Sequence, residues 1–151
     1  MKAYFFDTSA LVKRYITEIG LQWTQASTNP QEGNKVILAR ITWVEMLSAF
    51  SRLKRESAID ETVFNIALQA FEFDWDTQYQ IVEFDKILAE RAYDSVQLAS
   101  ALKIHQIYTK MVPGFFIFVS ADDRLLTVAT SEGMHVENPI VHSGSGSLLR
   151  S

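Results

Sequence analysis

Five short apolar segments, separated by helical patterns, most strongly constrain the fold of this 151-residue chain. A continuous apolar run of four to six residues predicts a strand that is buried on both faces of a sheet. The five segments cover residues 3–6, 36–39, 80–84, 115–120 and 135–137, and four of the five are continuous or nearly so. Apolar residues spaced three or four apart predict helices over residues 42–57, 60–73, 94–108 and 122–132. The alternation predicts an α/β protein, a three-layer α/β/α sandwich around a mainly parallel five-stranded sheet.

Length and composition narrow the class of protein. A chain of this length has room for one domain, which we predict over residues 1–140, followed by a flexible Gly- and Ser-rich tail at 141–151. The chain has no Cys, which excludes disulfide frameworks, iron–sulfur sites and thiol catalysis. No apolar stretch approaches the ~20 residues of a membrane helix, and the N-terminus lacks a signal-peptide pattern. We therefore expect a cytoplasmic protein that does not bind a membrane.

The charge balance limits how this chain can bind nucleic acid. Lys and Arg total 14 against 18 Asp and Glu, which gives a net charge of −4. A protein that binds nucleic acid mainly by neutralising phosphates is expected to be basic, so binding here requires a local basic patch or metal ions. The candidate cations are Lys13, Arg14, Arg52, Lys54, Arg55 and Arg91. For residues 52–55, a solvated helix face is an equally good explanation.

Four acids lie at the ends of predicted strands or at the starts of predicted helices: Asp7, Glu45, Asp94 and Asp122. Ligands of α/β sheets bind outside the carboxyl ends of the strands, so we expect these four carboxylates to meet in one pocket. Helix capping explains each acid taken alone, with capping-box patterns at 42–45, 94–97 and 120–123. Four converging carboxylates would repel one another unless a cation were bound. Oxygen ligands without Cys or paired His favour Mg²⁺ or Mn²⁺.

The sequence around these acids resembles a known family. Four segments carry the resemblance, in this order along the chain: Asp7-Thr8-Ser9-Ala10-Leu11-Val12, then residues 41–50, 91–99 and 118–125. They resemble the motifs of the PIN-domain nucleases, and most closely those of the VapC toxins, the ribonuclease half of type II toxin–antitoxin pairs. The resemblance extends over residues 1 to about 140 and implies a PIN-like fold.

The resemblance implies a function and a set of site residues. It implies an endoribonuclease toxin that depends on Mg²⁺ or Mn²⁺ and hydrolyses phosphodiester bonds of structured RNA such as tRNA or rRNA. Asp7, Glu45, Asp94 and Asp122 would be the catalytic, metal-binding acids. Supporting hydroxyls would come from Thr8, Ser9 and Ser120. The implied partners are a cognate antitoxin and a second copy of the chain in a homodimer.

One departure from the family keeps two other interpretations open. Only residues 85–90 separate the third strand from the third motif, about one helix fewer than the family usually has. A catalytically inactive PIN-like binding or scaffold module is the first alternative, and a DNA-acting nuclease of similar fold is the second. The shortened segment also predicts a protein–protein interface around residues 73–75 and 84–88. Core packing is the first explanation for the aromatic residues at 71, 73 and 75, and a partner surface is the second.

Overall fold

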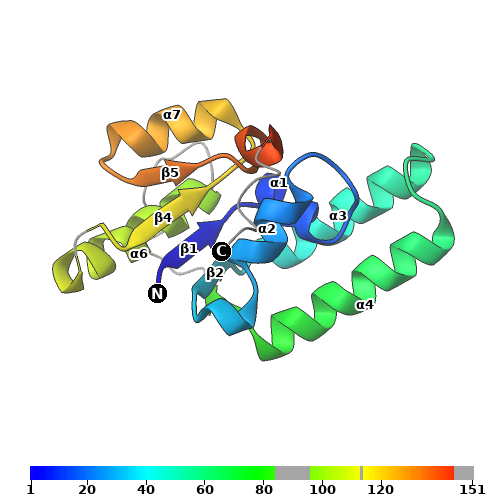
Figure 1. Cartoon of the computed structure of the whole chain (residues 1–151), viewed down its shortest axis with the longest axis horizontal. Helices are drawn as coiled ribbons and strands as arrows, with labels where there is room; N and C mark the ends of the chain where they lie inside the picture. Colours follow the sequence, from blue (N-terminus) through cyan, green and yellow to red (C-terminus); the bar gives the residue numbers. More distant parts are fainter. Residues whose placement is uncertain (84–95, 113, 145–151) are drawn as a thin grey trace.

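The structure is a computed structural model that describes residues 1–83, 96–112 and 114–144. Its strands form one five-stranded sheet in which every pair of neighbours is parallel (Figure 1). The order across the sheet is β3-β2-β1-β4-β5. The strands are β1 (Ala3–Phe6), β2 (Lys35–Ala39), β3 (Gln80–Val82), β4 (Phe116–Val119) and β5 (His135–Glu137). All five lie within or next to the segments predicted from their apolar runs, so the predicted sheet is confirmed.

The helices connect the strands and cover the sheet. They are α1 (Thr8–Leu11), η1 (Val12–Arg14), α2 (Leu21–Ser27), η2 (Pro30–Glu32), α3 (Thr42–Arg55), α4 (Glu61–Thr77), α6 (Val96–Met111), α7 (Asp123–Ser131) and η3 (Pro139–Gly144). The helix predicted over residues 60–73 ends too early. In the structure α4 continues to Thr77, and its last turn packs inward through Asp74 and Trp75. The predicted helix start at residue 94 lies outside the described residues. None of the described helices combines the length and the apolar character that a membrane span needs.

Two apolar cores, one on each face of the sheet, make the three layers. Successive side chains of a strand point to opposite faces, and β1 shows this directly. Tyr4 and Phe6 belong to the core beneath α1, α2, α3 and α4. Ala3 and Phe5 belong to the core beneath α6 and α7 (Figure 1). Since both faces are covered, the strands are apolar almost throughout, and the predicted α/β/α sandwich is confirmed.

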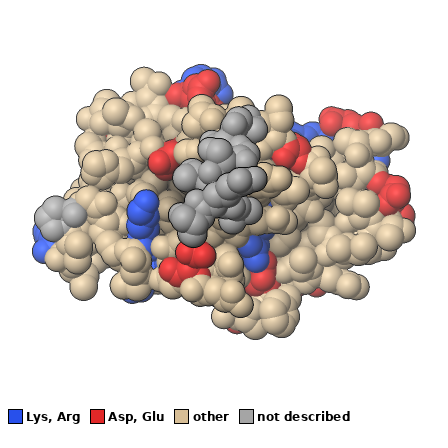
Figure 2. Space-filling view, in the orientation of Figure 1, with Lys and Arg blue, Asp and Glu red and all other residues tan. Residues whose placement is uncertain are grey.

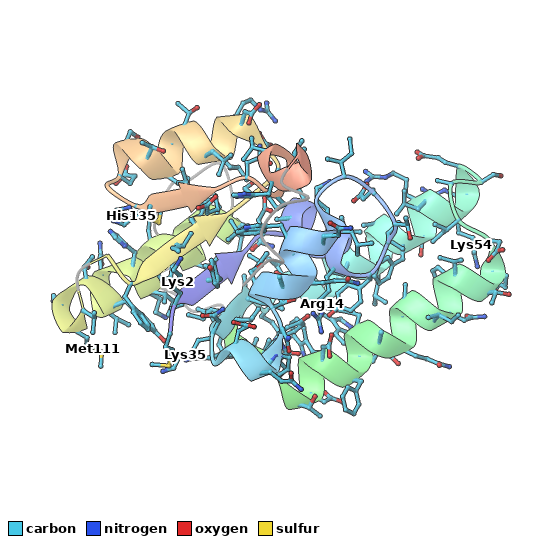
Figure 3. The ribbon with its side chains drawn as sticks, viewed as in Figure 1. Lys2, Arg14, Lys35, Lys54, Met111 and His135 are labelled. Atoms are coloured by element: carbon cyan, nitrogen blue, oxygen red, sulfur yellow. The ribbon has the colours of Figure 1, made fainter. Side chains whose placement is uncertain are left out.

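A buried polar cluster joins α4 to the segment after α1. Arg14 donates through Nε to Asp74 Oδ2 at 2.9 Å, and the Tyr15 hydroxyl donates to the same oxygen at 2.8 Å. Arg14 also donates through Nη1 to Thr28 Oγ1 at 2.5 Å, which holds its side chain between α2 and α4 (Figure 3). The side chains of Arg14 and Asp74 are 16% and 13% exposed. Arg14 is therefore a structural cation and not a surface group for binding phosphate.

The three aromatic residues near the end of α4 do not share one environment. Phe71 is fully buried, and Trp75 packs against it with ring centroids 5.7 Å apart. Phe73 is 68% exposed. Core packing therefore explains Phe71 fully, while Trp75 is half-buried and Phe73 is exposed to solvent. Residues 84–88, the other part of the predicted interface, lie outside the described residues.

The segment after β5 folds back onto α2. The His142 ring stacks on the Trp23 ring with centroids 4.7 Å apart and an interplanar angle of 5°. His142 Nε2 also lies 2.8 Å from Glu137 Oε2. Residues 141–144, which the sequence assigns to a flexible tail, lie in η3. Residues 145–151 lie outside the described residues.

Candidate active site

The candidate site lies where β1 and β4 end side by side. Phe6 pairs in register with Val119, and the Asp7 amide donates to the Val119 carbonyl at 3.0 Å. This pairing brings the residues after the two strands together, and α3 and α6 approach them from the side. A cleft of about 570 Å³ opens there, lined by Asp7, Thr8, Ser9, Val12, Val44, Glu45, Ser48, Ala49, Arg52, Arg55, Gln97, Asp122 and Leu125.

Asp7 is a buried carboxylate that is hydrogen-bonded on both oxygens. Its side chain accepts from Ser9 Oγ at 2.8 Å and from the Ala10 amide at 3.1 Å through Oδ1. Ser120 Oγ donates to Oδ2 at 2.7 Å. The bond to Ala10 caps α1, so the capping explanation holds for Asp7. The hydroxyl of Ser120 adds a link to the end of β4 that capping alone does not require.

The environment of Asp7 favours its neutral form. Burial raises the pKa of Asp7, hydrogen bonds from Ser120, Ser9 and the Ala10 amide lower it in part, and the charge of Glu45 raises it further. The result is a pKa of about 6. The low exposure of Asp7, which is 3%, and the nearby carboxylate of Glu45 both disfavour a negative charge on Asp7. A bound cation would remove this penalty.

Glu45 extends from α3 into the same cleft, and side chains of two other helices hold it. Thr8 Oγ1 donates to Glu45 Oε2, and Gln97 Nε2 donates to the same oxygen at 3.1 Å. Gln97 also donates to Thr42 Oγ1 at 2.9 Å. The capping box predicted for Thr42 and Glu45 is wrong, because α3 begins after Ile41 without any side-chain cap. Glu45 binds Thr8 and Gln97 from other helices instead of the backbone at the start of its own helix.

Gln97 is a site residue that the sequence analysis missed. It is 4% exposed, and its amide nitrogen binds Glu45, Thr42 and, at 3.3 Å, Thr8. Its carbonyl oxygen is buried without a hydrogen-bond partner among the described residues. In the sequence Gln97 stands only as the second member of a possible capping box. A glutamine within an otherwise apolar run of α6 was the available signal.

Asp122 lies at the rim of the cleft and caps α7. Its Oδ1 accepts from the Arg124 amide at 2.9 Å, and this bond lowers the pKa of Asp122. The N-cap of α7 is therefore Asp122, and the capping box predicted for Ser120 and Asp123 is wrong. Ser120 Oγ instead accepts from the Asp122 amide at 2.9 Å. Asp123 accepts from Asn138 at 3.2 Å, and Asp122 is the one of the two that lines the cleft.

The structure thus brings most of the predicted site residues to one edge of the sheet. These are Asp7, Thr8, Ser9, Glu45, Ser120 and Asp122. Asp94 lies outside the described residues. In the part of the chain that the structure describes, no three acidic or histidine side chains are grouped closely enough to hold a metal ion. The atoms of the site that could bind a metal ion are all oxygens, including the unpaired carbonyl oxygen of Gln97. Oxygen ligands of this kind fit Mg²⁺ or Mn²⁺.

Two of the six candidate cations line this cleft. Arg52 and Arg55 are exposed, and neither guanidinium has an ion-pair partner among the described residues. Lys13 is buried in an ion pair with Glu18 at 3.3 Å, and Lys54 pairs with Glu61 at the turn between α3 and α4 (Figure 3). Arg91 lies outside the described residues. On the face shown in Figure 2, basic and acidic side chains lie in small separate groups.

No protein-family model matches this sequence, and no curated protein matches it either. The fold and the cleft define the chain as a parallel α/β protein with hydroxyl-supported acids at the carboxyl edge of its sheet.

Proposed function

We propose that this chain is a metal-dependent endoribonuclease, the toxin component of a type II toxin–antitoxin pair, which hydrolyses phosphodiester bonds of RNA. One observation carries the proposal: the carboxylates of Asp7 and Glu45, which come from two different elements, face one cleft. Burial and the charge of Glu45 both raise the pKa of Asp7 there. The cleft also carries two exposed arginines. A site that only caps helices needs neither the second acid nor the cations.

The residues of the cleft have separate tasks in this function. Ser9 and Ser120 hold Asp7, while Thr8 and Gln97 hold Glu45, so both carboxylates keep fixed positions. Catalysis by positioning requires that the groups in contact with the substrate or the metal ion keep such fixed positions. Arg52 and Arg55 bind the phosphate backbone next to the cleaved bond. They supply the local positive charge that the net charge of −4 does not.

Asp7 and Glu45 would hold Mg²⁺ or Mn²⁺, with the Gln97 carbonyl as a further oxygen donor and Asp122 at the rim. The resemblance adds Asp94 to this set. Such an ion supplies a water of lowered pKa and neutralises charge on the scissile phosphate. No side chain has to act as the nucleophile, which agrees with the described lining of the cleft, where no Cys or His is found.

Incubation of RNA with the protein in Mn²⁺ and in chelator tests the proposal. We expect cleavage only with Mn²⁺, and a loss of at least ~100-fold for Glu45→Gln, because even partners behind metal ligands cost ~10–100-fold. Glu56→Gln is the matched control, since Glu56 is an exposed acid at the end of the same helix. Equal degradation with and without chelator would exclude the metal mechanism. Cleavage of DNA but not RNA would instead identify the DNA-acting alternative, and no cleavage by a folded protein would identify the binding module.

The proposal includes a homodimer and a cognate antitoxin, and it carries a cytoplasmic location with it because the RNA targets are there. A groove of about 670 Å³ between α2 and α4, with Ile66 and Phe73 exposed along it, supports a protein partner. Sedimentation of the isolated chain at tens of micromolar checks the dimer. We expect twice the mass of one chain, and a clean monomer would contradict the homodimer.

A further inference from the structure

A second, mainly apolar pocket of about 630 Å³ lies beside the candidate active site, between the start of α3 and the end of α4. It is lined by Arg40, Ile41, Trp43, Val44, Trp75, Asp76 and Val96. Its volume is in the range of pockets that bind small organic groups. Two of the three tryptophans of the chain line it.

The rings of this pocket are held in place by the core. Trp43 packs on the ring of Phe71 with centroids 5.4 Å apart and an interplanar angle of 30°. Trp75 meets Trp43 edge to face at 5.2 Å and 64°. Phe71 is fully buried, so it anchors both indoles from below. Rigid aromatic rings bind a flat ligand with little loss of side-chain entropy.

A planar cation lies over one of these rings. The Arg40 guanidinium is 5.6 Å from the centre of the Trp75 ring. Glu83 holds it by two hydrogen bonds, from Arg40 Nε at 3.0 Å and from Arg40 Nη2. The pair fixes the position of the guanidinium near the indole and offsets its charge locally. The pocket thus combines ring faces and a guanidinium plane with the Asp76 carboxylate as a hydrogen-bond acceptor.

The pocket is continuous with the candidate active site. Val44, which is 57% exposed, lines both the pocket and the cleft, and the next residue is Glu45. Farther along α3, Arg52 and Arg55 line the same cleft. A chain that passes from the tryptophans to the arginines therefore crosses the two held carboxylates.

We propose that the Trp43–Trp75 pocket binds an unpaired nucleobase of the RNA next to the phosphate that is cleaved. This inference rests on the proposed function and adds that the substrate is single-stranded at the cleavage site. Proteins recognise unpaired RNA bases by stacking them on aromatic side chains and on Arg planes, and such stacking is tolerant of base identity. A base-paired nucleotide keeps its faces covered by its neighbours and cannot enter. The polar side chains of Arg40 and Asp76 in the lining fit a polar flat base better than an apolar protein segment.

Equilibrium binding in chelator tests the pocket without any cleavage. The probe is a labelled eight-nucleotide single-stranded RNA, compared with the same RNA in a duplex, and the readout is fluorescence anisotropy. Trp75→Leu keeps an apolar side chain but removes the ring face, so we expect ~10-fold weaker binding or more, while Trp75→Phe changes it ~3-fold at most. We expect the duplex to bind at least ~10-fold more weakly than the single strand. Trp23→Phe, on the α2 side of the molecule, is the control and leaves the affinity unchanged.

The outcomes separate this inference from the proposed function. Equal affinities of Trp75→Leu and Trp75→Phe, or equal binding of duplex and single strand, would overturn it. If Trp75→Leu changes only the sedimentation of the chain and not the RNA affinity, the pocket takes a protein and the inference is wrong. Single-strand binding that depends on the ring face supports the pocket even if Mn²⁺-dependent cleavage is absent.

Discussion

Asp7→Asn is expected to lower RNA cleavage at least ~100-fold and, in chelator above pH 6, to raise the melting temperature of the protein. Asn keeps the shape of Asp and can still accept from Ser9 and the Ala10 amide. It removes a buried charge that burial and Glu45 both disfavour. The shift of the pKa from 3.8 to about 6 corresponds to roughly 2–3 kcal/mol of lost stability at neutral pH, or several degrees in melting temperature.

The direction of the pH dependence follows from where the proton is held. Between pH 3.8 and about 6 the folded protein keeps the proton of Asp7, while the unfolded chain has released it. Stability of the native protein therefore falls as the pH rises through this window. Below pH 4 both states are protonated at this position, so the advantage of the Asn variant disappears.

Thermal melting at pH 4 and pH 7, together with the cleavage assay, checks both halves of this prediction. Asp60→Asn is the matched control, because Asp60 caps α4 through the Val63 amide at 2.8 Å and is exposed. We expect no change for the control at either pH. Full cleavage by Asp7→Asn would refute the catalytic role of Asp7. An unchanged melting temperature at pH 7 would show that its charge is not disfavoured in the folded state.

Asp74→Ala is expected to destabilise the protein by about 3–5 kcal/mol, because it leaves the buried guanidinium of Arg14 without its anionic partner. The hydroxyl of Tyr15 loses its acceptor at the same time. A domain of this size is stable by only ~5–15 kcal/mol, so the variant is close to unfolding. Urea denaturation measures the loss as a shift of the midpoint at constant slope.

Glu72→Ala is the control for this prediction, since Glu72 is an exposed acid on the same helix. Its expected change is within ~0.5 kcal/mol, as for most surface substitutions. A loss below ~1 kcal/mol for Asp74→Ala would mean that Arg14 finds water or another partner when Asp74 is removed. Asp74→Asn keeps an oxygen acceptor and is expected to fall between the two.

The sheet could be predicted because its three central strands, β2, β1 and β4, are buried on both faces. Such strands leave a local mark in the sequence, a run such as Phe116 to Val119, that does not depend on the partner strands. The position of Asp7 and Ser120 followed from the same mark, because both come directly after a strand. The helices predicted over residues 60–73 and 122–132 from apolar spacing do begin at these positions, where the side chains of Asp60 and Asp122 bind the first turn.

The remainder of the site depends on contacts between distant parts of the chain. Glu45 matches a local capping pattern equally well, and only the approach of Thr8 and Gln97 decides its surroundings. Arg14 is equally plausible on a surface or in a buried pair, and Asp74, which pairs with it, lies sixty residues away. The spacing of nearby residues does not indicate the surroundings of either Glu45 or Arg14. Sequence patterns therefore identified the elements that carry the site better than the partners of each side chain.

The position of β1 in the middle of the sheet has a consequence for the synthesis of the chain. Asp7 is made before the residue that holds its second oxygen, because that hydroxyl belongs to Ser120, which is 113 positions later. The strand that brings Ser120 to Asp7 cannot pair with β1 until the residues up to the end of β4 have left the ribosome. An unfinished chain therefore carries the acids without the arrangement that orients them. If the chain cuts RNA as proposed, this order of assembly delays its activity until Ser120 has been made and β4 has paired with β1.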